Sequence, residues 1–239
     1  MDVTPDPITP QQFHDADGID DWRVLYWGAH AFFRAASYAA GARFVVAVTS
    51  IDEVARHEPD IDLRHEGVAV KLISRDIRNL STRDLELARR ISAIAREHGM
   101  RADAAALQVV QTAVASPESA DVTPFWQAVL GYVRPNESHL VDPLRRSSSV
   151  FLQPAETVGP GRGRMHVDVC VPHDQVHARI AAALAAGGRI ADDSFAPEWW
   201  TLADSENHKV DVTTWWGRDS VRLEEARLEK ARPEEPGRP

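Results

Sequence analysis

The second half of the chain carries an internal duplication, and this feature constrains the fold more than any other. Strand patterns at Leu107–Val114 and Met165–Val171 begin about 58 residues apart. Each is followed by a helical pattern, Pro124–Leu130 after the first and Gln175–Ala186 after the second, and a glycine ends each helix. We therefore expect two successive units of similar structure. Further strands are predicted at Ser148–Gln153, Trp199–Ala203 and Lys209–Thr214.

The first half has a different order of elements: helix, two strands, helix, one or two strands, helix. A short helix opens at Thr9, where Thr9 and Gln12 can form a capping box. An apolar stripe predicts a long helix, in which Gly41 indicates close packing. The helices after the first are predicted at Ser37–Arg56 and Leu85–Arg96, and the strands at Trp22–Trp27, His30–Ala36 and Gly67–Ser74.

Composition excludes several classes of protein. The single cysteine, Cys170, rules out an intrachain disulfide and a cysteine-based zinc site, and it is best explained as a small buried hydrophobe. The formal net charge of −9 argues against a nucleic-acid partner. No apolar run approaches the roughly 18 residues that cross a bilayer, and the start lacks a secretory pattern. We expect a cytoplasmic protein with no membrane partner. The charged residues 218–239 are expected to form a disordered tail.

The first half resembles the pterin-4-alpha-carbinolamine dehydratases. The resemblance is carried by Glu53–Arg64, Val68–Leu72 and Leu80–Ala88, and it extends over an expected domain of residues 8–100. It implies an α-β-β-α-β-β-α fold and removal of water from 4a-hydroxytetrahydropterin, which gives quinonoid dihydropterin. That elimination needs one group to protonate the leaving hydroxyl and another to take the N5 proton. The resemblance implies no metal or organic cofactor, a pterin as the small-molecule partner, and a homodimer or homotetramer.

The catalytic residues implied by this resemblance are His57, Glu58, Arg75 and Asp84. The family carries a His-His-Pro motif, of which this chain keeps His57 and Pro59, with Glu58 in place of the second histidine. A histidine with a pKa near neutral suits proton transfer, and Glu58 would complete an acid/base pair. A later Thr-His pair of the family is replaced by Ser74-Arg75.

Arg75 stays charged near neutral pH, so it can clamp a carbonyl or an anion but cannot exchange protons. Asp84 matches an acidic residue of the family's Leu-(Ser/Thr)-x-x-Asp segment. Pro59, Asp60 and Ser74 are implied as substrate-binding residues.

Plainer structural roles stay open for each of these residues. His57 could complement a helix dipole, Asp84 could only complete a helix cap, and Glu58 and Arg75 could be solvated surface charges.

The second half resembles the glyoxalase-like superfamily, also called vicinal-oxygen-chelate or bleomycin-resistance/dioxygenase proteins. Residues Pro124–Tyr132, Arg164–Val169 and Trp200–Val212 carry the resemblance, which implies a paired βαβββ domain over residues 104–217. The chain as a whole is therefore expected to have an α+β fold. The glycine-rich loop 159–164 lacks the strand–loop–helix context of a phosphate cradle and is interpreted as a connection.

Members of this superfamily can bind one divalent metal through four equivalent strand positions. Matching strand by strand gives Gln111, Gln153, His166 and Asp211 as candidate ligands. An imidazole, a carboxylate and amide oxygens could hold Mn²⁺, Fe²⁺, Ni²⁺ or Zn²⁺. Strand alternation places His166 and Asp168 on one face. The alternative is a metal-free sheet in which His166 and Asp211 have structural roles.

Three functional hypotheses follow. The first is a lyase that dehydrates 4a-hydroxytetrahydrobiopterin, with the glyoxalase-like domain as an accessory small-molecule domain. The second is an enzyme, perhaps metal-dependent, whose chemistry lies in the glyoxalase-like cleft. The third is a non-catalytic protein that binds a small molecule.

Overall fold

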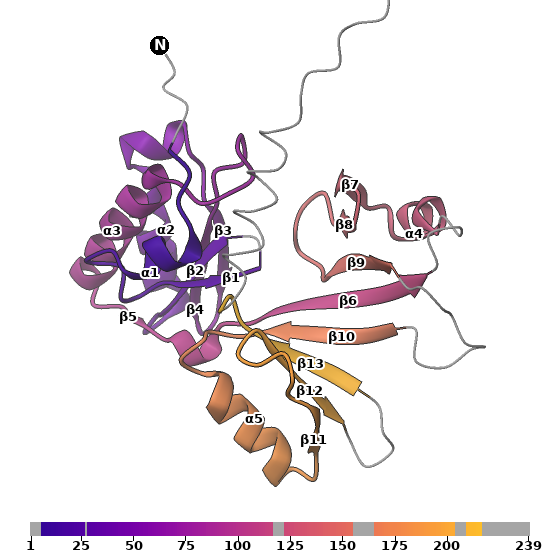
Figure 1. Cartoon of the computed structure of the whole chain (residues 1–239). Helices are drawn as coiled ribbons and strands as arrows, with labels where there is room; N and C mark the ends of the chain where they lie inside the picture. Colours follow the sequence, from indigo (N-terminus) through magenta and orange to yellow (C-terminus); the bar gives the residue numbers. More distant parts are fainter. Residues whose placement is uncertain (1–5, 27, 117–121, 155–164, 204–208, 217–239) are drawn as a thin grey trace, which may run out of the picture.

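A computed structural model of the chain describes residues 6–26, 28–116, 122–154, 165–203 and 209–216. The expected tail, residues 218–239, and the loop 159–164 lie outside the described residues. The structure is α+β, as predicted, with two antiparallel-rich sheets that follow one another along the chain (Figure 1). Among the described residues, no helix is both long enough and apolar enough to cross a membrane.

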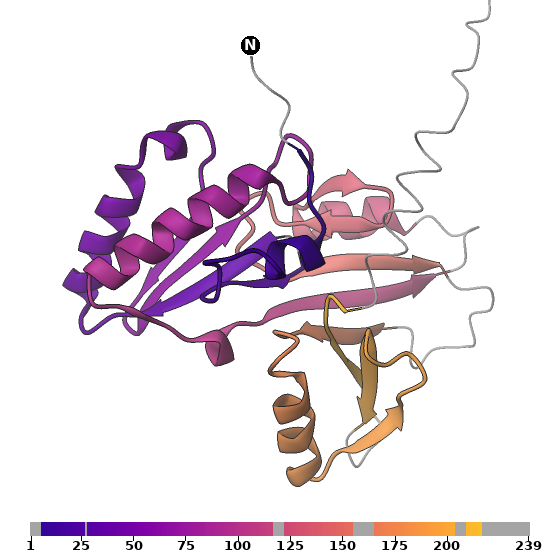
Figure 2. The same ribbon diagram turned by 60° about the vertical axis from the view of Figure 1, so that its left-hand side comes forward.

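The first part of the chain forms a sheet with the order β1-β2-β4-β3, and β5 pairs with β2. Helices α2 and α3 cover the face of this sheet that points away from the rest of the chain (Figures 1 and 2). The elements are α1 Pro10–His14, β1 Arg23–Leu25, β2 Gly28–Arg34, α2 Tyr38–Thr49, a 3₁₀ turn Asp52–Ala55, β3 Asp60–Arg64, β4 Gly67–Leu72, α3 Thr82–Glu97, β5 Arg101–Ala102 and a second 3₁₀ turn Ala104–Ala106.

The alternation of small and large apolar residues explains how this sheet packs. Ala31 and Phe33 on β2 and Val70 on β4 point toward the helices and are almost completely buried. Trp22 lies in the same core, where its indole Nε1–H donates to the Ala88 carbonyl oxygen at 3.2 Å. Gly41 is needed for close packing, as predicted, because a Cβ there would lie 2.7 Å from the side chain of Leu63.

Two boundaries in this part differ from the sequence prediction. The helix predicted over Ser37–Arg56 ends at Thr49. The hydroxyls of Thr49 and Ser50 both donate to the carbonyl oxygen of Val46, and the chain turns extended at Ile51. The strand predicted to begin at His30 begins at Gly28, whose φ is +133° and where a Cβ would lie 2.2 Å from the Leu72 carbonyl oxygen.

The second part forms one sheet with the order β11-β12-β13-β10-β6-β9-β8-β7. Its two halves are each βαβββ, which confirms the duplication, and β6 and β10 pair antiparallel at the centre. Strands β7, β8 and β11 are additions to the strands predicted from sequence. The elements are β6 Val109–Ser116, α4 Thr123–Leu130, β7 Val133–Asn136, β8 His139–Val141, β9 Ser149–Pro154, β10 Met165–Cys170, α5 Val176–Ala185, β11 Arg189–Asp192, β12 Trp199–Ala203 and β13 Lys209–Thr213.

Both helices of the second part pack on the same face of its sheet. Val176 and Ile180 of α5 contact Val212 of β13, and Trp126 of α4 packs against Val150 of β9. Residues at the intervening strand positions, among them His166, therefore point to the opposite face. That opposite face carries a group of polar side chains from neighbouring strands: Gln111, Ser149, His166, Asp168 and Asp211.

The two parts of the chain meet through a small apolar cluster and several polar contacts. Leu25 of the first sheet packs with Leu107 and Cys170 of the second part. The Thr213 hydroxyl donates to the Tyr26 hydroxyl at 2.9 Å. Cys170 is 1% exposed, in agreement with its predicted role as a buried hydrophobe.

A histidine–tryptophan cluster adds to this junction. His14 of α1 stacks on Trp215 at 5.0 Å between ring centroids, and its Nε2 accepts the backbone N–H of Val24 at 3.2 Å. The Trp215 indole N–H donates to Nδ1 of His173 at 3.2 Å. Burial, the largest cause, together with His173 and Arg23 lowers the pKa of His14 to about 4, although Asp174 and Asp15 oppose the shift.

We predict that the protein loses stability as the pH falls from 6.5 toward 4. In this window His14 becomes protonated in the unfolded chain but resists protonation in the folded chain. The folded chain therefore binds fewer protons than the unfolded chain, and its stability decreases as the pH decreases. The loss due to His14 is at most about 3 kcal/mol, since one pKa unit corresponds to about 1.36 kcal/mol. Urea unfolding between pH 7.5 and 4.5 measures it. His14→Gln should reduce this dependence without removing it, because burial also lowers the pKa values of His30 and His173. His65→Gln, at an exposed position, should leave it unchanged. An unchanged pH dependence in His14→Gln would contradict the assignment.

Candidate functional site

The loop between β4 and α3 places a buried carboxylate at the start of a helix. Asp84 is the third residue of α3, and its Oδ2 accepts the backbone N–H of Ser81 at 2.8 Å. A negative charge in the first turn of a helix is favoured by the unpaired N–H groups there. Asp84 therefore caps α3, which is the structural role that the sequence left open for it.

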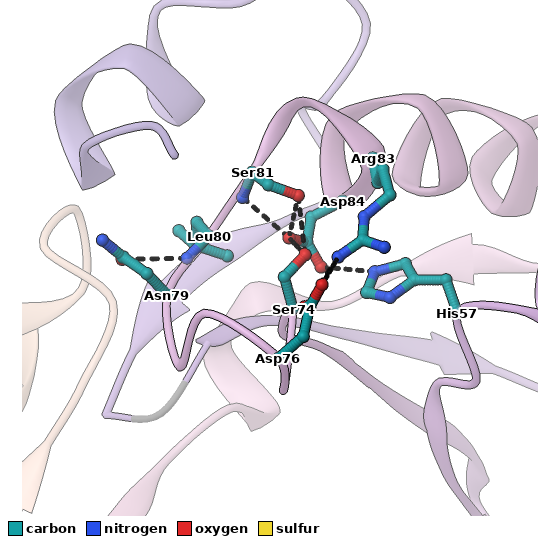
Figure 3. A network of polar contacts seen from close by, with 8 residues as sticks. All are labelled: His57, Ser74, Asp76, Asn79, Leu80, Ser81, Arg83 and Asp84. Carbon is teal, nitrogen blue, oxygen red and sulfur yellow. Dashed lines mark hydrogen bonds and ion pairs between the residues drawn. The ribbon is translucent and has the colours of Figure 1, made fainter. Parts of the chain in front are cut away.

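The same carboxylate also holds the candidate catalytic histidine. Asp84 Oδ1 lies 2.8 Å from Nε2 of His57, and Oδ2 accepts the hydroxyl of Ser74 at 2.9 Å (Figure 3). The Ser81 hydroxyl lies 2.6 Å from that of Ser74. Ser74, Ser81 and Asp84 are fully buried, and the His57 side chain is 10% exposed. We call these four residues the Asp84 network.

The network fixes which nitrogen of His57 is available for chemistry. A carboxylate that faces Nε2 favours the ring form with a proton on that nitrogen. Nδ1 of His57 makes no hydrogen bond within the described part of the chain. The arrangement can thus hold an imidazole in one orientation, with Nδ1 free to exchange a proton with a bound molecule.

The other residues predicted for this site, apart from Ser74, are more exposed than the Asp84 carboxylate. Glu58 is exposed, and Pro59 is half-buried beside it. Arg75 donates from Nη2 to Asp60 Oδ1 at 2.7 Å. Ser74, expected to bind substrate, is instead buried beneath Asp84, and its hydroxyl bonds to Ser81 and Asp84 of the network. The sequence did not predict that Ser81 belongs to this site. Its spacing of three residues from Asp84, typical of a capping box, was the available signal.

A second polar cluster lies on the sheet of the second part of the chain. His166, Asp168 and Asp211 each offer one ligand atom, and these atoms lie within 4.8 Å of one another. His166 Nε2 is 3.2 Å from Asp168 Oδ1 and 3.4 Å from Asp211 Oδ2. We call these three residues the carboxylate cluster.

Charge and burial shape this cluster. The Asp168 carboxylate is the largest influence that raises the pKa of His166. Burial raises the pKa of Asp211, although the Thr201 hydroxyl donates to its Oδ1 at 2.6 Å. Asp168 Oδ1 is buried and has no hydrogen-bond partner among the described residues, because His166 approaches it without hydrogen-bond alignment.

The structure changes the candidate ligand set predicted from sequence. His166 and Asp211 come together as expected, and Asp168 joins them because it pairs in register with Asp211 on the neighbouring strand. Gln111 pairs in register with Asp168, but its amide donates to the Ser149 hydroxyl at 2.9 Å. Gln153 is exposed and lies outside the cluster, because it pairs with Ala115, four residues beyond Gln111 on β6.

Comparison with known proteins agrees with this division of the chain. Residues 6–94 match the family model of pterin 4 alpha carbinolamine dehydratase, and residues 111–213 match that of the Glyoxalase-like domain. Two relatives carry the provisional name of pterin-4-alpha-carbinolamine dehydratase. One, from Acidobacterium capsulatum, is 37% identical over 88 residues, which are 36% of this chain and 96% of the relative. The other, from Chloroflexus aurantiacus, is 39% identical over 74 residues, 31% of this chain and 80% of the relative.

A Chloroflexus aggregans relative with the same provisional name is 39% identical over 62 residues, which cover 26% of this chain and 66% of that protein. Among solved structures, a transcriptional coactivator/pterin dehydratase from Brucella melitensis is matched at a TM-score of 0.35 and 19% identity, over 38% of this chain and 99% of that one. A glyoxalase/bleomycin resistance protein/dioxygenase superfamily member from Vibrio splendidus is matched at a TM-score of 0.31 and 13% sequence identity. The match covers 45% of this chain and 99% of that one.

These findings define a two-part α+β protein in which a pterin-dehydratase-like region precedes a glyoxalase-like one. The chain belongs to the pterin-4-alpha-carbinolamine dehydratase family. Both resemblances predicted from the sequence are confirmed.

We predict that Asp84→Ala lowers the free energy of unfolding of the first part by about 2–3 kcal/mol. The change removes the helix cap and leaves the Ser81 N–H and the Ser74 hydroxyl without their acceptor in a buried place. Urea unfolding followed by circular dichroism measures the loss. Asp62→Ala is the matched control, because that aspartate is exposed and pairs only locally with Arg64; it should change stability by less than about 0.5 kcal/mol. Equal effects of the two changes would contradict a central role for Asp84.

Proposed function

We propose that the first part of the chain is a hydro-lyase that dehydrates 4a-hydroxytetrahydrobiopterin to quinonoid dihydropterin. The observation that carries the proposal is the Asp84 network, which holds His57 at 2.8 Å from a buried carboxylate. Membership of the dehydratase family supports the same reaction. A pterin is accordingly the proposed small-molecule partner.

The reaction needs a proton delivered to oxygen and another removed from nitrogen. We assign His57, protonated on both nitrogens, to donate its Nδ1 proton to the hydroxyl on C4a while its Nε2–H stays on Asp84. The C4a–O bond then breaks and water leaves. The Glu58 carboxylate takes the N5 proton, and the electrons of the N–H bond form the N5=C4a double bond. Solvent returns the proton from Glu58 to His57, so the protein ends unchanged.

Asp84, Ser74 and Ser81 act in this proposal as positioning residues, since none of them contacts the substrate directly. A carboxylate that is itself fixed by three donors holds the imidazole in one orientation and balances the charge that it carries when protonated. Arg75, which follows Ser74 in the chain and is exposed, would orient the pterin through the oxygen or nitrogen atoms of its ring.

We predict that the wild-type chain dehydrates freshly generated 4a-hydroxytetrahydropterin faster than buffer, and that His57→Ala loses about 10²-fold or more of that enzymatic rate. Ultraviolet absorbance follows the reaction. His65→Ala is the matched control, because His65 is an exposed histidine in the same part of the chain. Asp84→Asn should lower kcat more than it raises KM and should alter the pH profile, whereas a purely structural role would leave the profile of the folded fraction unchanged. A wild-type rate no better than buffer would sink the lyase proposal.

The carboxylate cluster supports a second candidate function, a divalent-metal site in the glyoxalase-like part. Its donor set of one imidazole and two carboxylates suits Mn²⁺, Fe²⁺, Ni²⁺ or Zn²⁺. The buried Asp168 Oδ1 that lacks a hydrogen bond is the specific observation in its favour, because a buried carboxylate oxygen without a hydrogen bond costs free energy that a cation would offset. His166, Asp168 and Asp211 would hold the ion, which when bound could polarise a substrate oxygen as a Lewis acid.

We predict that the purified chain, loaded with each of these metals and dialysed, retains about one ion per chain. Elemental analysis measures the stoichiometry. Asp168→Asn should abolish retention, whereas Asp193→Asn, at an exposed position, should not. Retention by Asp168→Asn equal to wild type would count against this ligand set. Binding of a pterin without turnover and without metal would instead favour a non-catalytic binding protein.

The oligomeric state and cellular location stay predictions. A homodimer or homotetramer is expected by family resemblance, and sedimentation of the full chain would measure it.

A further inference from the structure

The uncovered face of the first sheet carries a row of polar side chains. The strand registers place Arg23, His30, Lys71 and Asp60 side by side across β1, β2, β4 and β3. This face is opposite the one covered by α2 and α3 and is turned toward the second part of the chain (Figure 1). Both ends of the row are tied to that part: Arg23 pairs with Asp174 at 2.7 Å, and Asp60 pairs with Arg145 at 2.8 Å.

Positive charge is concentrated at the Asp60 end. Asp60 accepts two hydrogen bonds from Arg145, at 2.9 Å from Nε and 2.8 Å from Nη2, and one from Arg75 at 2.7 Å. Lys71 lies beside it on the next strand. His30 adds no charge near neutral pH, because burial lowers its pKa to about 3. One carboxylate thus faces three cations, in a chain whose formal net charge is −9.

Of the three cations, Lys71 is the one whose charge is least balanced by a bonded carboxylate. Its ammonium has no hydrogen bond or ion pair within the described residues, and its side chain is half-buried. Burial lowers the pKa of Lys71, and Arg145 and Arg75 lower it further, against the attraction of Asp60. A partly desolvated ammonium that is repelled by two guanidinium groups is stabilised by an additional anion.

Arg145 reaches Asp60 from a loop in which its own backbone has a positive φ. Its φ is +56°, a left-handed conformation that is unfavourable for a non-glycine residue. The buried Asp142 holds the loop, because its carboxylate accepts the backbone N–H groups of Leu144 at 2.9 Å and Arg146 at 3.1 Å. Backbone strain of this kind persists where surrounding contacts impose it, often at ligand clamps.

We propose that Lys71, Arg75 and Arg145 form a binding site for the phosphate or carboxylate group of a small molecule that lies between the two parts of the chain. Two guanidinium forks and one ammonium are the donors that such groups bind best. The bound group would share the guanidinium donors with Asp60. The proposed dehydration does not require Lys71 or Arg145, so the site goes beyond that function and shares only Arg75 with it.

Binding of inorganic phosphate, measured by isothermal titration calorimetry on the full chain, tests the site. Wild type should bind saturably, Arg145→Gln and Lys71→Gln should each weaken binding at least tenfold, and Arg145→Lys should bind with intermediate affinity. Arg146→Gln is the matched control, because it is the adjacent arginine and its guanidinium pairs only with Asp142; it should bind within about twofold of wild type. Circular dichroism confirms that Arg145→Gln stays folded, which is expected because Arg75 still pairs with Asp60. The absence of saturable binding, or equal affinity in all variants, would overturn the proposal.

Two further probes identify the source of the anionic group. If pterin-6-carboxylate displaces phosphate and 6-hydroxymethylpterin does not, the site recognises an anionic substituent on a pterin, which 4a-hydroxytetrahydrobiopterin itself lacks. If neither pterin displaces it and a dicarboxylate such as glutarate does, the site serves a separate ligand. Because these experiments measure binding without turnover, a chain that binds phosphate but fails to dehydrate would retract only the proposed function. A chain that dehydrates but does not bind phosphate would retract only this inference.

Discussion

The carboxylate of Asp84 divides its two oxygens between the fold and the candidate chemistry. Oδ2 accepts the Ser81 N–H and the Ser74 hydroxyl, and so fixes where α3 begins. Oδ1 faces His57, which follows the 3₁₀ turn after α2. Because all the atoms around Oδ2 are buried, the position of the histidine depends on where the helix starts and on how β4 ends. Structural and functional roles, which the sequence offered as alternatives for Asp84, are therefore carried by one side chain at the same time.

In the second part of the chain, the polar residues are brought together by a different kind of structure. There the polar residues come from neighbouring strands in register, so their approach depends on strand pairing and not on a loop. The helices cover one face, and the polar side chains line the other. A carboxylate cluster of this kind is stable only if something balances its charge. In the described structure His166 supplies part of that balance, and Asp168 is left with an unsatisfied oxygen.

Local patterns predicted much of the fold, whereas the resemblance to the dehydratases pointed to His57 and Asp84 in the candidate site. Capping residues located the first helix, and strand alternation located β6, β9, β10 and β13. The long helix was extended too far, because its apolar spacing continues past Ser50 although the hydroxyls there divert the backbone. Short strands such as β7 and β8 carry few apolar residues and gave little signal. Asp168 was placed on the correct face, but its contact with Asp211 depends on a parallel pairing between distant segments. The pairing of Arg145 with Asp60 lies between residues 85 apart, and no local pattern encodes it.

The junction between the parts also affects how the sequence can change over time. Leu25 belongs to the first sheet, yet it fills space beside Leu107 and Cys170 of the second part. A substitution that alters the volume of Leu25 changes the packing of both parts of the chain, so few replacements are compatible with both. Compensating changes must then arise in the other part of the chain. The two parts of the chain are therefore expected to vary together at this contact.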